Sequence, residues 1–187
     1  MEHYDLVVIG AGPAGEKGAA QAAYFGKRVA IVEAGDEPGG ATVHTGTLPS
    51  KTLREASLYL SGHRNRELYG VAVELNSDTT LTTLLERKGA ISSSESRRMR
   101  ENLQKHGVDY YRAWGRLVDA HTIQVGEDQI SADIILLPTG SEPHRPSSIA
   151  FESDAIHDTD EILEITYLPK SMSIIGAGVI GCEYACM

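Results

Sequence analysis

The sequence has few of the residues that mark several common classes of protein. It contains only two cysteines, Cys182 and Cys186, both among the last six of its 187 residues. A disulfide scaffold is therefore excluded, and a reducing, cytoplasmic setting fits best. No apolar run approaches the roughly 18 to 20 residues that span a bilayer. The first residues carry acids rather than a basic region, which excludes a secretory signal, and we expect no membrane partner.

Basic residues are also scarce. Seventeen Lys and Arg stand against 26 Asp and Glu, a net charge of −9. Proteins that bind nucleic acids through the phosphate backbone present a clustered basic face, so we expect no nucleic-acid partner. The basic residues between Arg87 and Lys105 are interspersed with glutamates, which predicts a solvated helix face. The seven histidines have no metal-ligand spacing, and no metal site is predicted.

The chain opens with a strand–helix–strand pattern. Residues 4–9 and 28–32 are short apolar runs, which predict two buried parallel strands. The alanine-rich residues 13–25 between them predict a helix that ends at Gly26. The order and length are typical of a parallel crossover unit in an α/β fold.

The remaining composition predicts a longer series of elements. A loop at 34–50 is followed by a helix at 51–60, a weakly patterned connection at 63–77 and one helix at 79–106 that is long or broken at Ser92–Ser94. Next come a third parallel strand at 108–113, an antiparallel meander at 115–118, 121–125 and 129–131, and a fourth buried strand at 133–137. A linker at 142–160 and a new strand at 171–175 end the series.

A glycine-rich turn follows the first strand. Gly10, Gly12 and Gly15, with Pro13 and Ala14 between them, permit a tight turn, close approach of the backbone to a pyrophosphate, and close helix–strand contact. Eighteen residues beyond Gly15, Glu33 ends the second strand, where a carboxylate can accept hydrogen bonds from both hydroxyls of an adenosine ribose. The alternative, a turn used only for packing, would not need Glu33. The pattern predicts a dinucleotide site.

A second turn of the same pattern follows residues 171–175, with Gly176, Gly178 and Gly181 at the matching positions. A packing turn remains an alternative here, because the pattern stands without a second strand and acid. Two dinucleotide sites in one polypeptide imply electron transfer between two cofactors, typically a flavin and a nicotinamide.

Four motifs, in this order, resemble those of the pyridine nucleotide–disulfide oxidoreductase flavoproteins. They are the first turn with Glu33, the active-site segment from Gly39 to Lys51, the second FAD motif from Thr139 to Pro143, and the NAD(P) turn at 176–185. The resemblance implies bound FAD and NAD or NADP. It also implies cofactor contacts from Gly10, Gly12, Pro13, Ala14, Gly15, Glu33, Gly39, Gly40, Ala41, Thr42, Gly46, Lys51, Gly115, Thr139, Gly140, Ser141, Gly176, Gly178 and Gly181.

The fold class that the resemblance implies is α/β. Residues 1–145 would form the N-terminal part of a Rossmann-like FAD-binding domain, with a parallel sheet, helices and a small antiparallel meander. A linker at 146–170 and the start of a second Rossmann-like domain for NAD(P) at 171–187 follow. The chain resembles a fragment of a longer, cytoplasmic enzyme that would form a homodimer or higher oligomer.

The active-site segment departs from the family pattern at the residues that carry its chemistry. The family places two cysteines there, with four residues between them, where this chain has Thr42 and Thr47. A threonine hydroxyl forms no disulfide and no low-pKa thiolate, which argues against disulfide-linked reduction. The pattern from His44 to Lys51 instead resembles the soluble pyridine nucleotide transhydrogenases of the family, which implies transfer of hydride between nicotinamide nucleotides through FAD.

The resemblance also assigns catalytic roles to Lys51 and Glu183. It implies that Lys51 points at flavin N5 and pairs with Glu183 of the NAD(P) turn, where a fixed cation would stabilise reduced flavin. Two other functions stay open, a non-catalytic dinucleotide-binding module and a dihydrolipoamide-dehydrogenase-like enzyme that has lost its disulfide. The residues do not decide between NADH and NADPH or identify the final electron acceptor.

Overall fold

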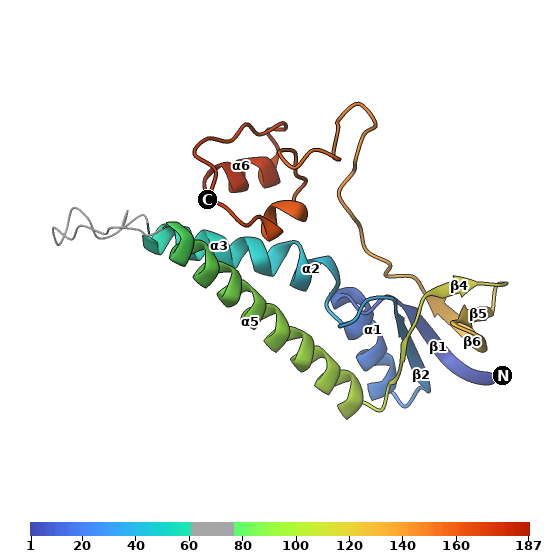
Figure 1. The fold of residues 1–187 in the computed structure, drawn as a ribbon. Helices are drawn as coiled ribbons and strands as arrows, with labels where there is room; N and C mark the ends of the chain where they lie inside the picture. Colours follow the sequence, from blue (N-terminus) through green and yellow to red (C-terminus); the bar gives the residue numbers. More distant parts are fainter. Residues whose placement is uncertain (61–76) are drawn as a thin grey trace. The chain divides into compact units, whose positions relative to one another are not determined.

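The computed structural model describes residues 1–60 and 77–187, which form two compact units (Figure 1). The first unit comprises residues 1–44 and 93–142, and the second comprises residues 45–92 and 143–187. The weakly patterned connection predicted at 63–77 lies, except for Ser77, outside the described residues.

A six-stranded sheet forms the centre of the first unit. Its spatial order is β3-β2-β1-β6-β5-β4. β1 pairs in parallel with β2 and with β6, β2 pairs in parallel with β3, and β4, β5 and β6 form an antiparallel meander. The predicted α/β fold with a parallel sheet and a small meander is therefore confirmed. The strands are β1 (Glu2–Ile9), β2 (Val29–Glu33), β3 (Asp109–Arg112), β4 (Gly115–Leu117), β5 (Thr122–Val125) and β6 (Asp128–Leu136).

Both faces of the parallel strands are covered, which explains why β1 from Leu6 to Ile9 and β2 from Val29 to Val32 are continuously apolar. On one face Val8 and Ile31 pack against Ala19 of α1 (Pro13–Tyr24) and Leu103 of α5 (Ser77–Lys105). Figure 1 shows α1 beside β1 and β2. On the other face a second cluster joins residues of β1 and β2 to the meander, among them Ile123.

The described residues of the second unit form three helical segments besides the first part of α5. They are α3 (Thr47–Leu60), the short 3-10 helix η1 (Glu161–Glu164) and α6 (Val179–Ala185). Lys88 of α5 donates to the Leu163 carbonyl (2.9 Å) and pairs with Glu164 (2.7 Å), so η1 is tied to α5. The Tyr184 hydroxyl donates to the Thr159 carbonyl (3.2 Å), which holds α6 against the chain before η1.

The structure corrects one helix prediction and decides between the two alternatives of another. The predicted loop at 34–50 contains α2 (Gly40–His44), and α3 begins at Thr47 rather than at Lys51. Pro49 does not prevent this, because it stands in the first turn, where a helix needs no N–H from it. Of the two alternatives left open for residues 79–106, the long helix is confirmed, because α5 continues without a break through Ser92–Ser94. An exposed serine lowers helix stability only by tenths of a kcal/mol, roughly, relative to alanine.

Two predictions about strands also need correction. Residues 129–137, predicted as two segments, form most of the single strand β6, and its second half is not buried, since Ile134 is 64% exposed. That half has β1 on one side only among the described residues. The strand predicted at 171–175 is absent: these residues pair with no other described strand, and Ile175 is 89% exposed. A strand needs a neighbour for its backbone hydrogen bonds.

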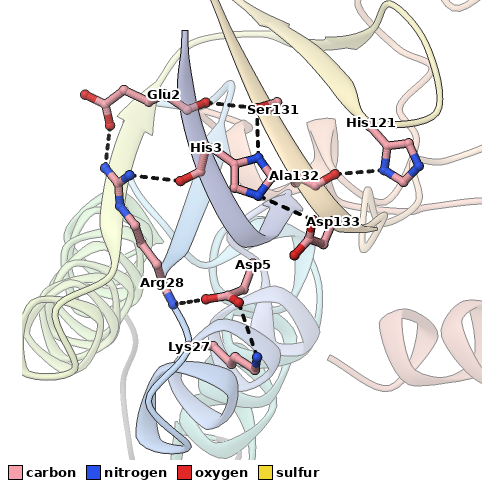
Figure 2. Close-up of polar contacts among 9 residues, drawn as sticks. All are labelled: Glu2, His3, Asp5, Lys27, Arg28, His121, Ser131, Ala132 and Asp133. Atoms are coloured by element: carbon pink, nitrogen blue, oxygen red, sulfur yellow. Dashed lines mark hydrogen bonds and ion pairs between the residues drawn. The ribbon is translucent and has the colours of Figure 1, made fainter.

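Charged side chains cross-link the strands at the amino end of the sheet (Figure 2). The Asp5 carboxylate of β1 accepts the Arg28 N–H (2.7 Å) and pairs with Lys27 (3.2 Å). The Arg28 guanidinium donates to the His3 carbonyl (2.9 Å) and pairs with Glu2 (2.7 Å). The residues directly before β2 are therefore joined to the start of β1 by side-chain contacts, in addition to the main-chain hydrogen bonds between the two strands.

These contacts predict a pH dependence of stability. The hydrogen bond from the main-chain N–H of Arg28 is the main cause that holds the pKa of the Asp5 carboxyl below its ordinary value, and the hydrogen bond from the Lys27 side chain is the next. A carboxyl whose pKa is lowered by folding stabilises the protein above its unfolded pKa, and the contribution is lost as the pH falls through the folded pKa. We therefore expect Asp5→Asn to lower the free energy of unfolding at pH 7, and the difference from wild type to shrink below about pH 4.

Urea unfolding of both proteins between pH 7 and pH 3 measures this difference. Asp154→Asn is the matched control, because the Asp154 carboxylate is exposed and has no hydrogen bond or ion pair with any described residue. A difference for Asp5→Asn that stays constant over the whole pH range would contradict the prediction.

Candidate dinucleotide-binding site

The first glycine-rich turn connects β1 to α1 through a conformation that suits glycine. Gly10 has φ +114°, in the left-handed region, and Gly12 is the N-cap of α1. Pro13 takes the first helical position, where its missing N–H is not needed. Among the described residues, the first N–H of α1 that bonds to the main chain is that of Glu16, to the Gly12 carbonyl (2.9 Å). The N–H groups before it, those of Ala14 and Gly15 included, remain for an anion.

Two of the glycines stand where no side chain fits. A Cβ on Gly15 would overlap the Gly10 carbonyl oxygen, and a Cβ on Gly10 would lie 2.5 Å from the Pro138 carbonyl oxygen. The absence of side chains lets α1 approach the end of β1. It also brings Pro138 and Thr139, which follow β6, against the turn.

Glu33, the last residue of β2, is oriented by main-chain donors. Its Oε2 accepts the Ala11 N–H (2.6 Å) and its Oε1 accepts the Gly35 N–H (2.7 Å). No salt bridge to Glu33 occurs within residues 1–60 and 77–187, so its charge is not neutralised by an adjacent cation. An ionised carboxylate offers about four acceptor positions. Two are occupied here, and two remain for a ligand.

The start of the predicted active-site segment lies on the same turn. The Gly39 N–H donates to the Ala11 carbonyl (2.9 Å). Gly39 and Gly40 both have positive φ, and a Cβ on Gly40 would lie only 3.2 Å from the Gly12 Cα. Ala41 and Thr42 follow within α2, with Ala41 exposed and Thr42 half-buried.

Gly115 and the second predicted motif complete this edge of the sheet. A Cβ on Gly115 would contact the Ile9 and Val32 side chains at 3.2 and 3.3 Å, so Gly115 lies across the ends of β1 and β2. Gly140 has φ +80°, and Ser141 after it is exposed. The chain runs from β1 to β2 on one side, while β6 lies on the other. Ligands of open α/β sheets bind at such a switch point, outside the carboxyl ends of the strands.

The remaining predicted residues belong to the second unit. Gly176 has φ +117°, Gly178 is the N-cap of α6, and a Cβ on Gly181 would overlap the Gly176 carbonyl oxygen, as in the first turn. Lys51 is exposed on α3, Gly46 precedes that helix, and Glu183 is half-buried on α6. No ion pair or hydrogen bond joins Lys51 to Glu183 in the described part of the chain, and their pairing stays a prediction.

The sequence pattern did not identify the donors that hold Glu33. These donors are the main-chain N–H groups of Ala11 and Gly35. Every residue except proline has such a group, so no side-chain type in the sequence reveals which of them will donate. Pro138 was equally missed as a neighbour of Gly10. Its role depends on the register of β6 beside β1, which pairs Val8 with Leu136.

Among the described residues, no His, Cys, Asp and Glu side chains form a group of three or more that could hold a metal ion. None of the helices within residues 1–60 and 77–187 combines the length and apolar character that crossing a membrane requires.

The glycine-rich turn, Glu33 and the switch point together form a candidate dinucleotide-binding site in an α/β fold. A family model described as pyridine nucleotide-disulphide oxidoreductase matches residues 4–187. The chain belongs to that family.

Relatives of known name agree with this assignment. The soluble pyridine nucleotide transhydrogenase of Mycobacterium bovis (strain BCG / Pasteur 1173P2) is 46% identical over 194 residues, covering 100% of this chain and 41% of that protein. The protein of the same name from Marinomonas sp. (strain MWYL1) is 38% identical, covering 98% of this chain and 40% of its own length. The chain therefore spans about two-fifths of these relatives.

The fold is shared with a solved flavoprotein. The HOCl-induced flavoprotein disulfide reductase RclA from Escherichia coli superposes with a TM-score of 0.82 at 24% identity, over 97% of this chain and 39% of RclA. At this identity the likeness establishes the fold alone.

The glycine geometry predicts different outcomes for two substitutions. Gly12 has extended backbone angles, and a Cβ there would lie 3.9 Å from the Gly40 Cα, so Gly12→Val should change the free energy of unfolding by less than about 1 kcal/mol. The added side chain should obstruct the helix start and weaken ADP binding at least about tenfold, by roughly 1.4 kcal/mol. Gly15→Ala should instead destabilise the fold by about 1–3 kcal/mol, because the new Cβ meets backbone.

Calorimetric titration with ADP and urea unfolding separate the two effects. Gly89→Ala is the control, because a Cβ at Gly89 of α5 has open space around it. Unchanged ADP affinity in Gly12→Val would show that ligand does not approach this turn.

Proposed function

We propose that the first unit binds FAD at the Gly10–Gly15 turn, and that the protein is an FAD-dependent NAD(P)H oxidoreductase without a redox disulfide. Within that class we propose hydride transfer between NADPH and NAD⁺. The observation that carries the FAD site is the Glu33 carboxylate, held by main-chain donors beside a glycine-lined helix start. The transhydrogenase relatives support the reaction.

The residues present fit a dinucleotide. The N–H groups at the start of α1 would bind the pyrophosphate, and the close contact of Gly40 with Gly12 leaves backbone rather than side chains beside it. The two unused acceptor positions of Glu33 equal the number of hydroxyls on an adenosine ribose. Each feature therefore matches one part of the adenosine diphosphate moiety of FAD.

The chemistry would come from the cofactor and not from cysteine. When bound, FAD supplies a centre that accepts a hydride from one nicotinamide nucleotide and returns it to another. Thr42 and Thr47 have no redox chemistry at the positions where the family pattern has cysteines. Cys182 on α6 and Cys186 directly after that helix are exposed and have free thiols. We therefore favour a nicotinamide nucleotide over a disulfide as the acceptor.

The experiment that tests the FAD site is a titration of the chain with FAD, followed by flavin fluorescence. Wild type should bind, and Glu33→Gln should bind at least about tenfold more weakly, because hydrogen bonds to a charged group contribute about 1.5–3 kcal/mol each. Glu127→Gln, at an exposed glutamate, should bind as wild type does. Absence of FAD binding by the wild-type chain would refute the proposal.

We further propose that Lys51 and Glu183 act at the flavin ring, as the family resemblance implies. A cation beside the ring stabilises the electron-rich reduced form. Replacement of Lys51 with Met should therefore lower the midpoint potential of bound flavin, while FAD affinity persists because the pyrophosphate and ribose contacts lie elsewhere. Lys170→Met, at an exposed lysine, provides the comparison. An unchanged potential in a Lys51→Met protein that retains FAD would show that Lys51 does not act on the flavin.

A further inference from the structure

Arg100 reaches from α5 to the loop that follows Glu33. Its guanidinium pairs with the Glu37 carboxylate (3.0 Å) and donates to the Asp36 carbonyl (3.4 Å). The guanidinium also lies 5.6 Å from the ring centroid of Tyr110 on β3. One side chain therefore connects a helix, a loop and a strand of the first unit.

Tyr110 gives the guanidinium a fixed neutral surface. Burial, and then the charge of Glu33, raise the pKa of Tyr110 to about 12. The ring therefore stays un-ionised at neutral pH. A neutral aromatic ring attracts a cation placed over its face. Tyr110 also lies opposite Ile31 in the β2–β3 ladder, so the parallel sheet sets its place.

The loop that Arg100 contacts contains one of the two donors on Glu33. Gly35 donates its N–H to Glu33 Oε1 (2.7 Å), and Asp36 and Glu37 follow directly. The main chain of Glu33 is fixed separately, because its carbonyl accepts the Ala113 N–H (2.9 Å). The position of the loop therefore decides whether the Gly35 N–H meets the carboxylate.

We propose that Arg100 is a positioning residue for the adenosine end of the site. It holds the loop from Gly35 to Glu37 where the Gly35 N–H orients Glu33 toward a ribose. The ligands it affects are adenine nucleotides with free ribose hydroxyls. The inference rests on the proposed FAD site. Arg112 of β3 adds a second contact to the same loop, because it pairs with Asp36.

The same helix provides a matched control for Arg100. Arg98 stands two residues earlier, carries the same charge, and pairs with Glu95 of its own helix. Its side chain is 54% exposed, close to the 48% of Arg100. Substitution of Arg98 therefore removes a similarly exposed helix arginine without removing a contact to the loop.

The experiment measures the dissociation constants of ADP and FAD for wild type, Arg100→Gln, Arg100→Lys and Arg98→Gln. Arg100→Gln should weaken both ligands by about three- to fivefold, the upper range for a half-exposed ion pair. Arg100→Lys should recover part of the loss, because it keeps the charge opposite Glu37, and Arg98→Gln should bind as wild type does. The ratio of wild-type to Arg100→Gln affinity should fall toward one in about 1 M NaCl, since salt screens the pair.

A double substitution tests whether Arg100 acts through the loop. Glu37→Gln alone should weaken the binding of ADP. Combining it with Arg100→Gln should weaken binding little further, because both changes remove the same ion pair. If Arg100→Gln fails to fold, Glu37→Gln decides, since it removes the same pair from the loop side.

The two proposals fail in different ways. A wild-type chain that binds neither ADP nor FAD overturns the proposed function. A wild-type chain that binds both, with Arg100→Gln or Glu37→Gln unchanged in affinity, overturns only the role of Arg100.

Discussion

The hydrogen bond from the Ala11 N–H to the Glu33 carboxylate joins the turn after β1 to the end of β2. These strands are parallel neighbours, so both ends lie at one edge of the sheet. The bond orients the carboxylate with a neutral donor, where a lysine or arginine would also have neutralised it. The charge and half of the acceptor positions therefore remain for a ligand. The Gly39 N–H, which donates to the Ala11 carbonyl, extends the same turn to the active-site segment.

That arrangement requires α1 to begin very close to β1, which only Gly10 and Gly15 allow. The close approach of α1 to β1 also affects Glu16, the residue after Gly15. Glu16 is fully buried, with its carboxylate next to Lys17 and Asn102 of α5. A buried carboxylate is unfavourable unless it is paired, and the positive end of a helix dipole favours an acid in the first turn. The helix start proposed to hold a pyrophosphate thus also stabilises an acid of the protein.

Sequence patterns predict the first unit better than the second for a physical reason. A strand buried on both faces must be apolar, and a turn without room for Cβ must be glycine, so β1, β2 and the glycines of the first turn could be predicted. The start of α3 could not, because Thr47, Pro49 and Ser50 suit a loop and a first helical turn equally. The strand predicted at 171–175 is wrong because strand propensity is realised only beside a neighbouring strand. At the site, Glu33 is visible in the sequence, whereas its main-chain donors are not.

The amino and carboxyl ends of the parallel strands differ in the groups that surround them. At the amino ends of the strands, charged side chains are paired with each other, as Asp5 with Lys27 and Glu2 with Arg28 (Figure 2). At the carboxyl ends glycines and main-chain N–H groups predominate around Glu33, which has no cationic partner in the described chain. Paired charges at a surface have little residual attraction for a small ligand. Oriented N–H groups and a carboxylate without a cationic partner remain able to attract a polar ligand, and both occur at the carboxyl ends of β1 and β2.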